Sequence, residues 1–184
     1  MESIKQKQEN AYDALKDAFS LTNRMESPRL EKIVINVGTG SVKDKEKVEV
    51  IEDRLRRITG QQPVRTVAKQ SIAAFTLREG SPVGYQVTLR GDRMYNFLDK
   101  LVHLAMPRMK DFHGISTKPI DAMGNYTLGI REHTIFPETS DEDLKNVFGM
   151  AITVVTSTSD RAAAEAFFRH LGFPFQKEEA TEAA

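Results

Sequence analysis

The stretch from Val64 to Arg93 constrains the fold more than any other part of the sequence. Two short runs within it, Val64–Val67 and Tyr85–Leu89, have the β-branched and aromatic composition of strands. Between them lie about sixteen residues, 69–84, which include two glycines and one proline. A connection of this length within a compact domain is usually functional. The sequence therefore predicts two strands joined by a long loop.

The same stretch is rich in positive charge. It holds five basic residues against two acidic ones, a balance of +3 in a chain whose net charge is zero. The basic residues are Arg65, Lys69, Arg78, Arg90 and Arg93. Such a loop suits an anionic partner. On pattern alone, a hairpin whose Ile72, Phe75 and Leu77 fold back onto the domain is an equally good interpretation.

Size and composition restrict the class of protein. A chain of 184 residues with 40% hydrophobic content can bury one sizeable core. It has no cysteine, which excludes disulfides and thiolate metal sites and fits a reducing compartment. No segment approaches the roughly twenty apolar residues that cross a bilayer, and the N-terminus has no apolar signal core. We therefore expect a cytoplasmic protein without a membrane partner.

Charge is divided unevenly along the chain. Residues 1–137 hold 22 Lys and Arg against 17 Asp and Glu, whereas residues 138–184 hold 4 against 9. A partner that carries phosphates would be attracted to the first part, and a basic protein to the second. Scattered surface charge that serves no partner is the alternative.

The sequence lacks the usual signatures of catalysis and of metal binding. Its four histidines are dispersed, and there is no HExxH pair and no GxSxG turn. Asp141 and Asp143 follow Ser140 in the pattern of a helix capping box, so a pair of catalytic carboxylates has little support. We therefore predict a binding protein that is not an enzyme and that needs no cofactor.

Periodicity predicts the remaining elements. An amphipathic helix is expected over residues 4–19, and a second helix from Asp44 to Gly60. A third is expected after Asp92 as N-cap, with Leu104 among its buried residues, and a fourth after Ser159 as N-cap, with Ala163 facing the core. Strands are expected over residues 30–37, 125–131 and 150–155. The predicted architecture is a single α+β domain (29–175), preceded by a helix and linker (1–28) and followed by an acidic tail (176–184).

Strand alternation places several polar side chains on one side of the predicted sheet. Ile33, Ile35 and Val37 share one face of their strand, which leaves Asn36 on the other. In the strand that ends at Leu89, Gln86, Thr88 and Arg90 oppose the apolar residues. With helices on the apolar side only, these four polar residues form an open face suited to RNA. A solvated face without a ligand is the alternative reading.

Two other functional classes stay open at this stage. A strand followed by Gly38, Gly40 and a helix resembles a phosphate-binding turn, which would suit a small nucleotide-dependent enzyme that uses residues 38–43. The third glycine of the dinucleotide fingerprint is replaced by Lys43, and an ordinary tight connection explains the turn better. A pure protein-interaction module is the other class, and it would not require Arg90 for RNA binding.

Seven segments, in order and spacing, resemble the bacterial form of large-subunit ribosomal protein five. They are LEKIVINVG (30–38), ITGQ (58–61), VGYQVTLRGDRM (83–94), MPRMKDF (106–112), GNYTLGIRE (124–132), FPE (136–138) and LGFPF (171–175). The resemblance extends from about residue 28 to residue 175. So many ordered segments make a chance resemblance improbable.

The resemblance implies a structural constituent of the large ribosomal subunit: an antiparallel sheet with helices on one face that binds 5S rRNA and seats it in the central protuberance. It also implies contacts with 23S rRNA and with other central-protuberance proteins. The 5S rRNA-binding residues expected from it and from the open face are Asn36, Gly38, Gln61, Thr66, Lys69, Gln86, Thr88, Arg90 and Arg93.

The resemblance further assigns the loop and the acidic region. It implies that the loop 69–84 reaches the P-site tRNA through Ser71, Ile72, Phe75, Arg78, Gly80 and Pro82. It implies an intersubunit bridge to small-subunit ribosomal protein thirteen through Pro137, Glu138, Asp141, Glu142 and Asp143. Metal ligands and catalytic residues are not expected.

The chain departs from the family pattern at several basic positions. Gln70 stands where a second basic residue is usual at the loop entrance, and Ala122-Met123 replaces a Gly-Arg pair. Gln176 replaces an arginine near the C-terminus. Because each phosphate contact contributes about 0.7–0.9 to the salt slope of binding, fewer cations predict a flatter salt dependence.

Overall fold

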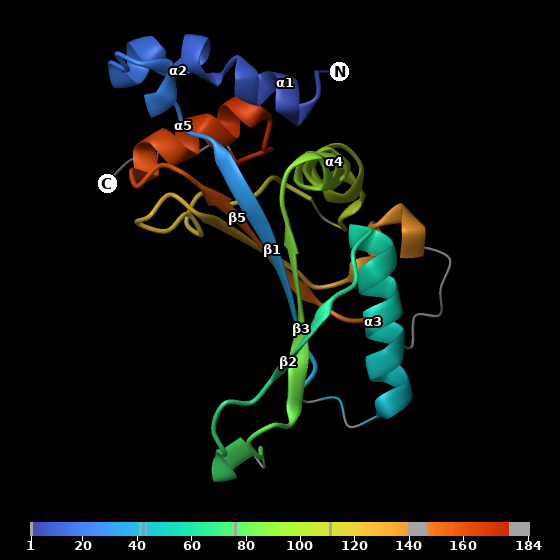
Figure 1. Ribbon diagram of the computed structural model, residues 1–184. Helices are drawn as coiled ribbons and strands as arrows, with labels where there is room; N and C mark the ends of the chain where they lie inside the picture. The colour runs from blue at the N-terminus through green and yellow to red at the C-terminus, as the bar shows by residue number, and fades with distance from the viewer. Residues whose placement is uncertain are drawn as a thin grey trace, which may run out of the picture.

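A computed structural model describes residues 2–40, 42, 44–75, 77–110, 112–139 and 147–176 (Figure 1). The helices are α1 (Ile4–Glu9), α2 (Ala11–Phe19), α3 (Lys45–Thr59), α4 (Asp92–Lys100) and α5 (Arg161–Leu171). The strands are β1 (Leu30–Gly38), β2 (Val64–Val67), β3 (Pro82–Leu89), β4 (Tyr126–Ile130) and β5 (Met150–Thr156). Short turns of helix include η2 (Ala73–Phe75), η3 (Leu101–Ala105), η5 (His133–Ile135) and η6 (Pro137–Thr139). Among the described residues, no helix is long and apolar enough to cross a membrane.

The five strands form one antiparallel sheet in the order β2-β3-β1-β5-β4. The long central strand β1 pairs with β3 on one side and with β5 on the other, so it connects the two sides of the sheet. Strands from both halves of the sequence meet there, which makes the sheet a single unit. The predicted α+β architecture is therefore confirmed.

Alternation gives the sheet a buried face and an open face. The inward side chains of β1, Ile33, Ile35 and Val37, are at most 1% exposed. They belong to one core that also receives apolar side chains of α1 to α5, the α-helices among the described residues. Where β1, β2 and β3 cross the lower half of Figure 1, helix α3 covers the sheet from one side only.

Helix ends agree with the sequence prediction in one case and differ in two. Helix α3 is capped by the Asp44 side chain at its start and by Gly60, with a φ of 66°, at its end, as predicted. Helix α4 instead has Gly91 as N-cap, because Asp92 already lies in the first turn and makes no cap bond. Helix α5 uses Asp160, whose carboxylate accepts from the Ala162 N–H, in place of Ser159.

The burial predicted for two helical residues was also wrong. Leu104 is 53% exposed, because η3 winds as a π-helix after α4 and moves the residue out of the buried stripe. In α5 the fully buried alanine is Ala164, whereas Ala163 is half-buried. Phe167 and Leu171, the other residues of α5 predicted to face the core, are fully buried.

The N-terminal segment forms two helices in place of one. Asn10 separates α1 from α2, and α1 lies between α4 and α5. The Ile4 N–H donates to the Asp99 carboxylate at 2.9 Å, and Lys7 Nζ donates to the Leu171 carbonyl at 3.0 Å. Since these bonds reach residues far along the chain, α1 is integrated in the core layer.

The connection between β2 and β3, residues 68–81, projects from the sheet as an arm at the bottom of Figure 1. Its base is closed by hydrogen bonds from the Ala68 N–H to the Ser81 carbonyl and from the Gly80 N–H to the Ala68 carbonyl. Paired bonds between Ile72 and Leu77 hold the tip. Phe75 is 75% exposed, so the arm does not fold back onto the domain.

The facing glycines Gly38 and Gly84 provide a test of the β1–β3 pairing. A Cβ at Gly84 would overlap the Val37 carbonyl oxygen, whereas a Cβ at Gly38 would meet nothing within 4 Å. We expect Gly84→Ala to lower the free energy of unfolding by about 1–3 kcal/mol, because backbone must move to admit the methyl group. Gly38→Ala is the matched control and should cost little. Urea unfolding followed by circular dichroism measures both, and equal losses would contradict the pairing.

Candidate nucleic-acid interface

The open face is formed by outward side chains of all five strands. Its members are Lys32, Val34, Asn36, Val64, Thr66, Gln86, Thr88, Thr127, Gly129, Ala151, Thr153 and Val155, and none of them is buried. Register places Asn36 directly between Gln86 of β3 and Ala151 of β5. It also places Val34 between Thr88 and Thr153. Three predicted site residues, Asn36, Gln86 and Thr88, are thus brought together on one surface.

Polar groups on this face are available to a ligand. The side chains of Asn36, Gln86 and Thr88 have no hydrogen-bond partner among the residues that the structure describes. Farther along, the hydroxyls of Thr127 and Thr153 lie 3.1 Å apart and bond to each other across β4 and β5. An amide supplies both donors and acceptors, so the face can meet either kind of group on a partner.

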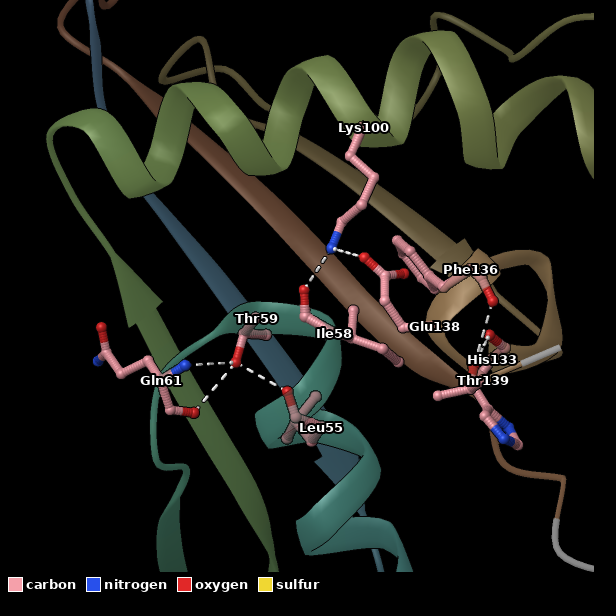
Figure 2. Close-up of polar contacts among 9 residues, drawn as sticks. All are labelled: Leu55, Ile58, Thr59, Gln61, Lys100, His133, Phe136, Glu138 and Thr139. Carbon is pink, nitrogen blue, oxygen red and sulfur yellow. Dashed lines mark hydrogen bonds and ion pairs between the residues drawn. The ribbon is translucent and has the colours of Figure 1, made fainter. Parts of the chain in front are cut away.

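Gln61 extends the face at the edge next to β2. Its Nε2 donates to the Thr88 carbonyl at 3.2 Å, and its backbone N–H donates to the Thr59 hydroxyl at 3.3 Å. Thr59 Oγ1 in turn donates to the Leu55 carbonyl at 2.7 Å, as Figure 2 shows. The end of α3 therefore fixes Gln61 against β3.

A junction around Lys100 holds the end of α3 to the segment after β4 (Figure 2). Lys100 Nζ lies 2.6 Å from both the Ile58 carbonyl oxygen and Glu138 Oε1. The same ammonium lies 5.9 Å and 5.8 Å from the ring centroids of Phe97 and Phe136, within cation–π range. One cation on α4 thus joins α3 and η6.

The remaining residues predicted for 5S rRNA are more dispersed. Thr66, which pairs with Gly84, belongs to the open face, and Gly38 borders the face at the end of β1. Arg90 follows β3 and is exposed. Lys69 lies in the arm, and Arg93 lies on α4, where it lines a depression on the helix side. The structure therefore does not bring Lys69 and Arg93 onto the open face.

The residues predicted for the tRNA loop lie along the arm. Ser71 Oγ accepts from the Glu79 N–H at 2.9 Å, and Gly80 has a φ of 80°, which favours glycine. Pro82 begins β3. The exposed residues Ile72, Phe75 and Arg78 are left to face outward. The arm thus presents an apolar tip beside a cation.

Only part of the predicted bridge region is described. Pro137 and Glu138 begin η6, and Glu138 is engaged by Lys100. Asp141, Glu142 and Asp143, and the capping box that begins at Ser140, lie outside the described residues. So does the tail from residue 177.

Sequence reasoning missed several members of the open face. Thr127 of β4 and Thr153 of β5 lie on this face, and alternation along each strand would have included them. The order of the strands could not be read from the sequence, so β5 was not placed beside β1 and β4 was not placed beside β5. Once the order of the strands is known, the alternation of buried and exposed residues is enough to identify them.

Two tyrosines on the helix-covered side of the sheet have clearly shifted pKa values. Burial raises the pKa of Tyr126 to about 12, and burial also raises the pKa of Tyr85. Both phenols therefore stay neutral in the core at neutral pH. Among the described residues, no group of three or more His, Cys, Asp or Glu side chains could hold a metal ion.

Comparison with known proteins decides the family. The family model described as ribosomal protein L5 matches residues 23–78, and the model for the C-terminus of the same ribosomal protein family matches residues 82–175. The chain belongs to the ribosomal protein L5 family. Its resemblance to this family, inferred above from the seven segments, is thereby confirmed.

Curated relatives agree over nearly the whole chain. The large ribosomal subunit protein uL5 of Natranaerobius thermophilus is 48% identical over 88% of this chain and 90% of its own length. The uL5 of Oceanobacillus iheyensis is 47% identical over 96% and 100%, respectively. The uL5 of Oenococcus oeni is 50% identical over 89% and 92%. Because the family consists of structural proteins of the large ribosomal subunit, the predicted non-enzymatic role is confirmed and the nucleotide-dependent enzyme is set aside.

The Lys100 junction generates a stability prediction. Lys100→Met keeps the apolar stem of a side chain that is 19% exposed but removes its ammonium, which bonds a carboxylate and a carbonyl. We expect a loss of about 1–2 kcal/mol in the free energy of unfolding, because two charge-assisted bonds in a partly buried site disappear. Urea unfolding checks it.

Lys5→Met is the matched control. Its partner Asp92 is 81% exposed and Lys5 itself 55%, so water screens this pair and its loss should leave the unfolding midpoint nearly unchanged. Equal shifts in the two variants would show that the Lys100 junction contributes no more than a surface ion pair.

Proposed function

We propose that this protein binds 5S rRNA through the open face and helps attach it in the central protuberance of the large subunit. The observation that carries the proposal is the uncovered row of polar side chains centred on Asn36, which no helix of the described chain covers. Membership of the ribosomal protein L5 family supports an RNA partner for that row.

The chemistry of the face suits double-stranded RNA recognised by shape. A-form RNA displays 2′-hydroxyls and phosphate oxygens along a wide, shallow minor groove. Amide and hydroxyl side chains such as those of Asn36, Gln86 and Thr88 can both donate to and accept from a 2′-hydroxyl. Contacts of this kind position a helix without reading its sequence.

Few cations accompany these groups. Lys32 lies on the face, and Arg90 at its border is exposed. Hydrogen bonds to sugars are therefore expected to carry more of the affinity than counterion release does, and the salt slope should be modest.

Asn36→Ala and Thr88→Val test the open face. Each removes a side chain that has no partner in the described protein, so the RNA group opposite would be left unpaired. We expect a loss of about 1–3 kcal/mol in 5S rRNA binding, with little change in the unfolding midpoint. Filter binding at fixed salt measures the affinity.

Asn96→Ala is the matched control, because Asn96 is an exposed asparagine on α4, on the helix side. Full affinity in Asn36→Ala and Thr88→Val would reject the face. A loss in Asn96→Ala of the same size would show that the effect is not specific to the face.

The arm supports a second part of the proposal, a contact with the P-site tRNA. Phe75 is 75% exposed and Ile72 is 42% exposed at the tip, which is costly in water but suits packing against nucleotide sugars or bases. Arg78 and Lys69 flank this tip and can meet phosphates.

Phe75→Ala tests the arm. Since the ring contributes little to the core, the unfolding midpoint should not change, whereas ribosomes that carry the variant should hold P-site tRNA about 1–3 kcal/mol less tightly. Met25→Ala is the control, because Met25 is 68% exposed elsewhere, in the turn before β1. Unchanged tRNA retention by the Phe75→Ala ribosomes would reject this contact.

The acidic region supports a third part, a bridge to small-subunit ribosomal protein thirteen. Residues 138–184 carry an excess of acidic groups, which suits a basic protein partner. Pro137 and Glu138 begin this region next to the Lys100 junction. Contacts with 23S rRNA and neighbouring proteins of the central protuberance complete the proposed set of partners.

A further inference from the structure

A groove of about 550 Å³ is lined by the end of β4, the edge strand at the opposite end of the sheet from the arm. We call it the edge groove, and its lining includes Arg108, Lys110, Gly129, Arg131, Glu132 and Thr134. Three cations and one acid give it a net positive charge. All three cations are exposed, and none forms an ion pair with a residue that the structure describes.

Backbone donors add to this charge. The Thr127 N–H points to the outer side of β4, because it donates to the Pro119 carbonyl at 3.4 Å. N–H groups alternate in direction along an antiparallel strand, so the N–H of Gly129 also points outward. Pro119 lies beside the start of the strand, and Gly129 lines the edge groove beyond it. An outward amide beside free cations is a favourable arrangement for a phosphate oxygen.

Small residues connect the edge groove to the open face. The row that contains Gln86 and Asn36 continues through Ala151 to Gly129, which is exposed. A Cβ at Gly129 would meet nothing within 4 Å, so packing within the protein does not require glycine at this strand position. A strand glycine often marks a place where another backbone approaches closely.

We propose that the edge groove is a second RNA contact, in which the phosphodiester backbone of the RNA on the open face passes closely over Gly129 and is held by the three cations. This inference rests on the proposed function, and it adds the chemical reason for Gly129 and a role for Arg108, Lys110 and Arg131. RNA would then contact the sheet from Asn36 to its outer edge.

An acidic peptide is the competing occupant, since a peptide could add as a strand to β4. Ile120 already forms a bridge with Tyr126, and Pro119 accepts from Thr127, so part of this five-residue strand is occupied at its outer edge. The short remainder is a poor template for strand addition, which needs a run of free backbone groups. RNA needs no such run, and the observations favour it.

Gly129→Val is the decisive variant. The side chain has room and valine favours strands, so the unfolding midpoint should hold or rise. On the open face, however, the isopropyl group would prevent close approach of RNA, and we expect at least about a tenfold loss of 5S rRNA affinity. The full-length protein and purified 5S rRNA are compared by filter binding.

The double variant Arg108→Ala/Arg131→Ala tests the cations separately. Removal of two phosphate contacts should flatten the plot of log affinity against log salt by about 1.4–1.8. The control is Lys16→Ala/Arg161→Ala, which removes two exposed cations from α2 and α5 and should leave the slope unchanged.

The outcomes distinguish a failure of the edge groove from a failure of the proposed 5S rRNA binding. If the wild-type protein binds 5S rRNA and both groove variants bind it with the same affinity and salt slope, the edge groove is rejected as an RNA contact. The proposal for the open face is then unaffected. Absence of wild-type binding to 5S rRNA would reject the proposed function, and the RNA contact at the groove with it. Binding of poly-glutamate that is lost in the double variant, while the affinity and salt slope for 5S rRNA stay unchanged there, would assign the groove to an acidic peptide and overturn the RNA proposal.

Discussion

One-sided burial of an antiparallel sheet is the constraint on which the rest of the structure depends. Every strand alternates, so a side chain next to a core residue must point away from the core. Ile35 and Val37 of β1 are almost fully buried, and this fixes Asn36 on the opposite face. The helices contribute to one core, and the other face is left wetted. The open face proposed for RNA is therefore a direct consequence of how the protein forms its core.

The register of the strands extends this division into a buried and an open face across the whole sheet. Because partners in an antiparallel pair lie on the same face, the position of Asn36 determines that of Gln86 and Ala151. A slip of one residue would bury the amides and expose the isoleucines. The close contact of Gly84 with the β1 backbone resists such a slip, because a residue with a side chain would overlap the Val37 carbonyl oxygen at this position. Folding and the proposed RNA contact thus depend on the same pairing.

Local signals in the sequence were sufficient for the elements and for part of the site. Alternation located Asn36 and Thr88, and Asp44 with Gly60 located both ends of α3, because a cap depends on a few neighbouring residues. Where two capping residues compete, as Ser159 and Asp160 do, composition does not decide between them. Leu104 and Gly129 depend on a π-helical turn and on the order of the strands, which are set by tertiary packing. The arm was identified by its length, but its projection from the domain followed only from the exposure of Phe75.

The Lys100 junction shows how two distant surfaces are kept in a fixed relation. Its ammonium holds the Ile58 carbonyl at the end of α3, just before the chain turns through Thr59 and Gln61 into β2, and it holds Glu138 at the start of the acidic region. Both bonds are 2.6 Å long and the lysine is largely shielded from water, so they constrain geometry more than a surface ion pair does. Gln61 borders the face proposed for 5S rRNA, and Glu138 borders the region proposed for the small subunit. A single cation therefore links the orientation of one surface to that of the other, which suits the proposed position of the protein between 5S rRNA and the small subunit.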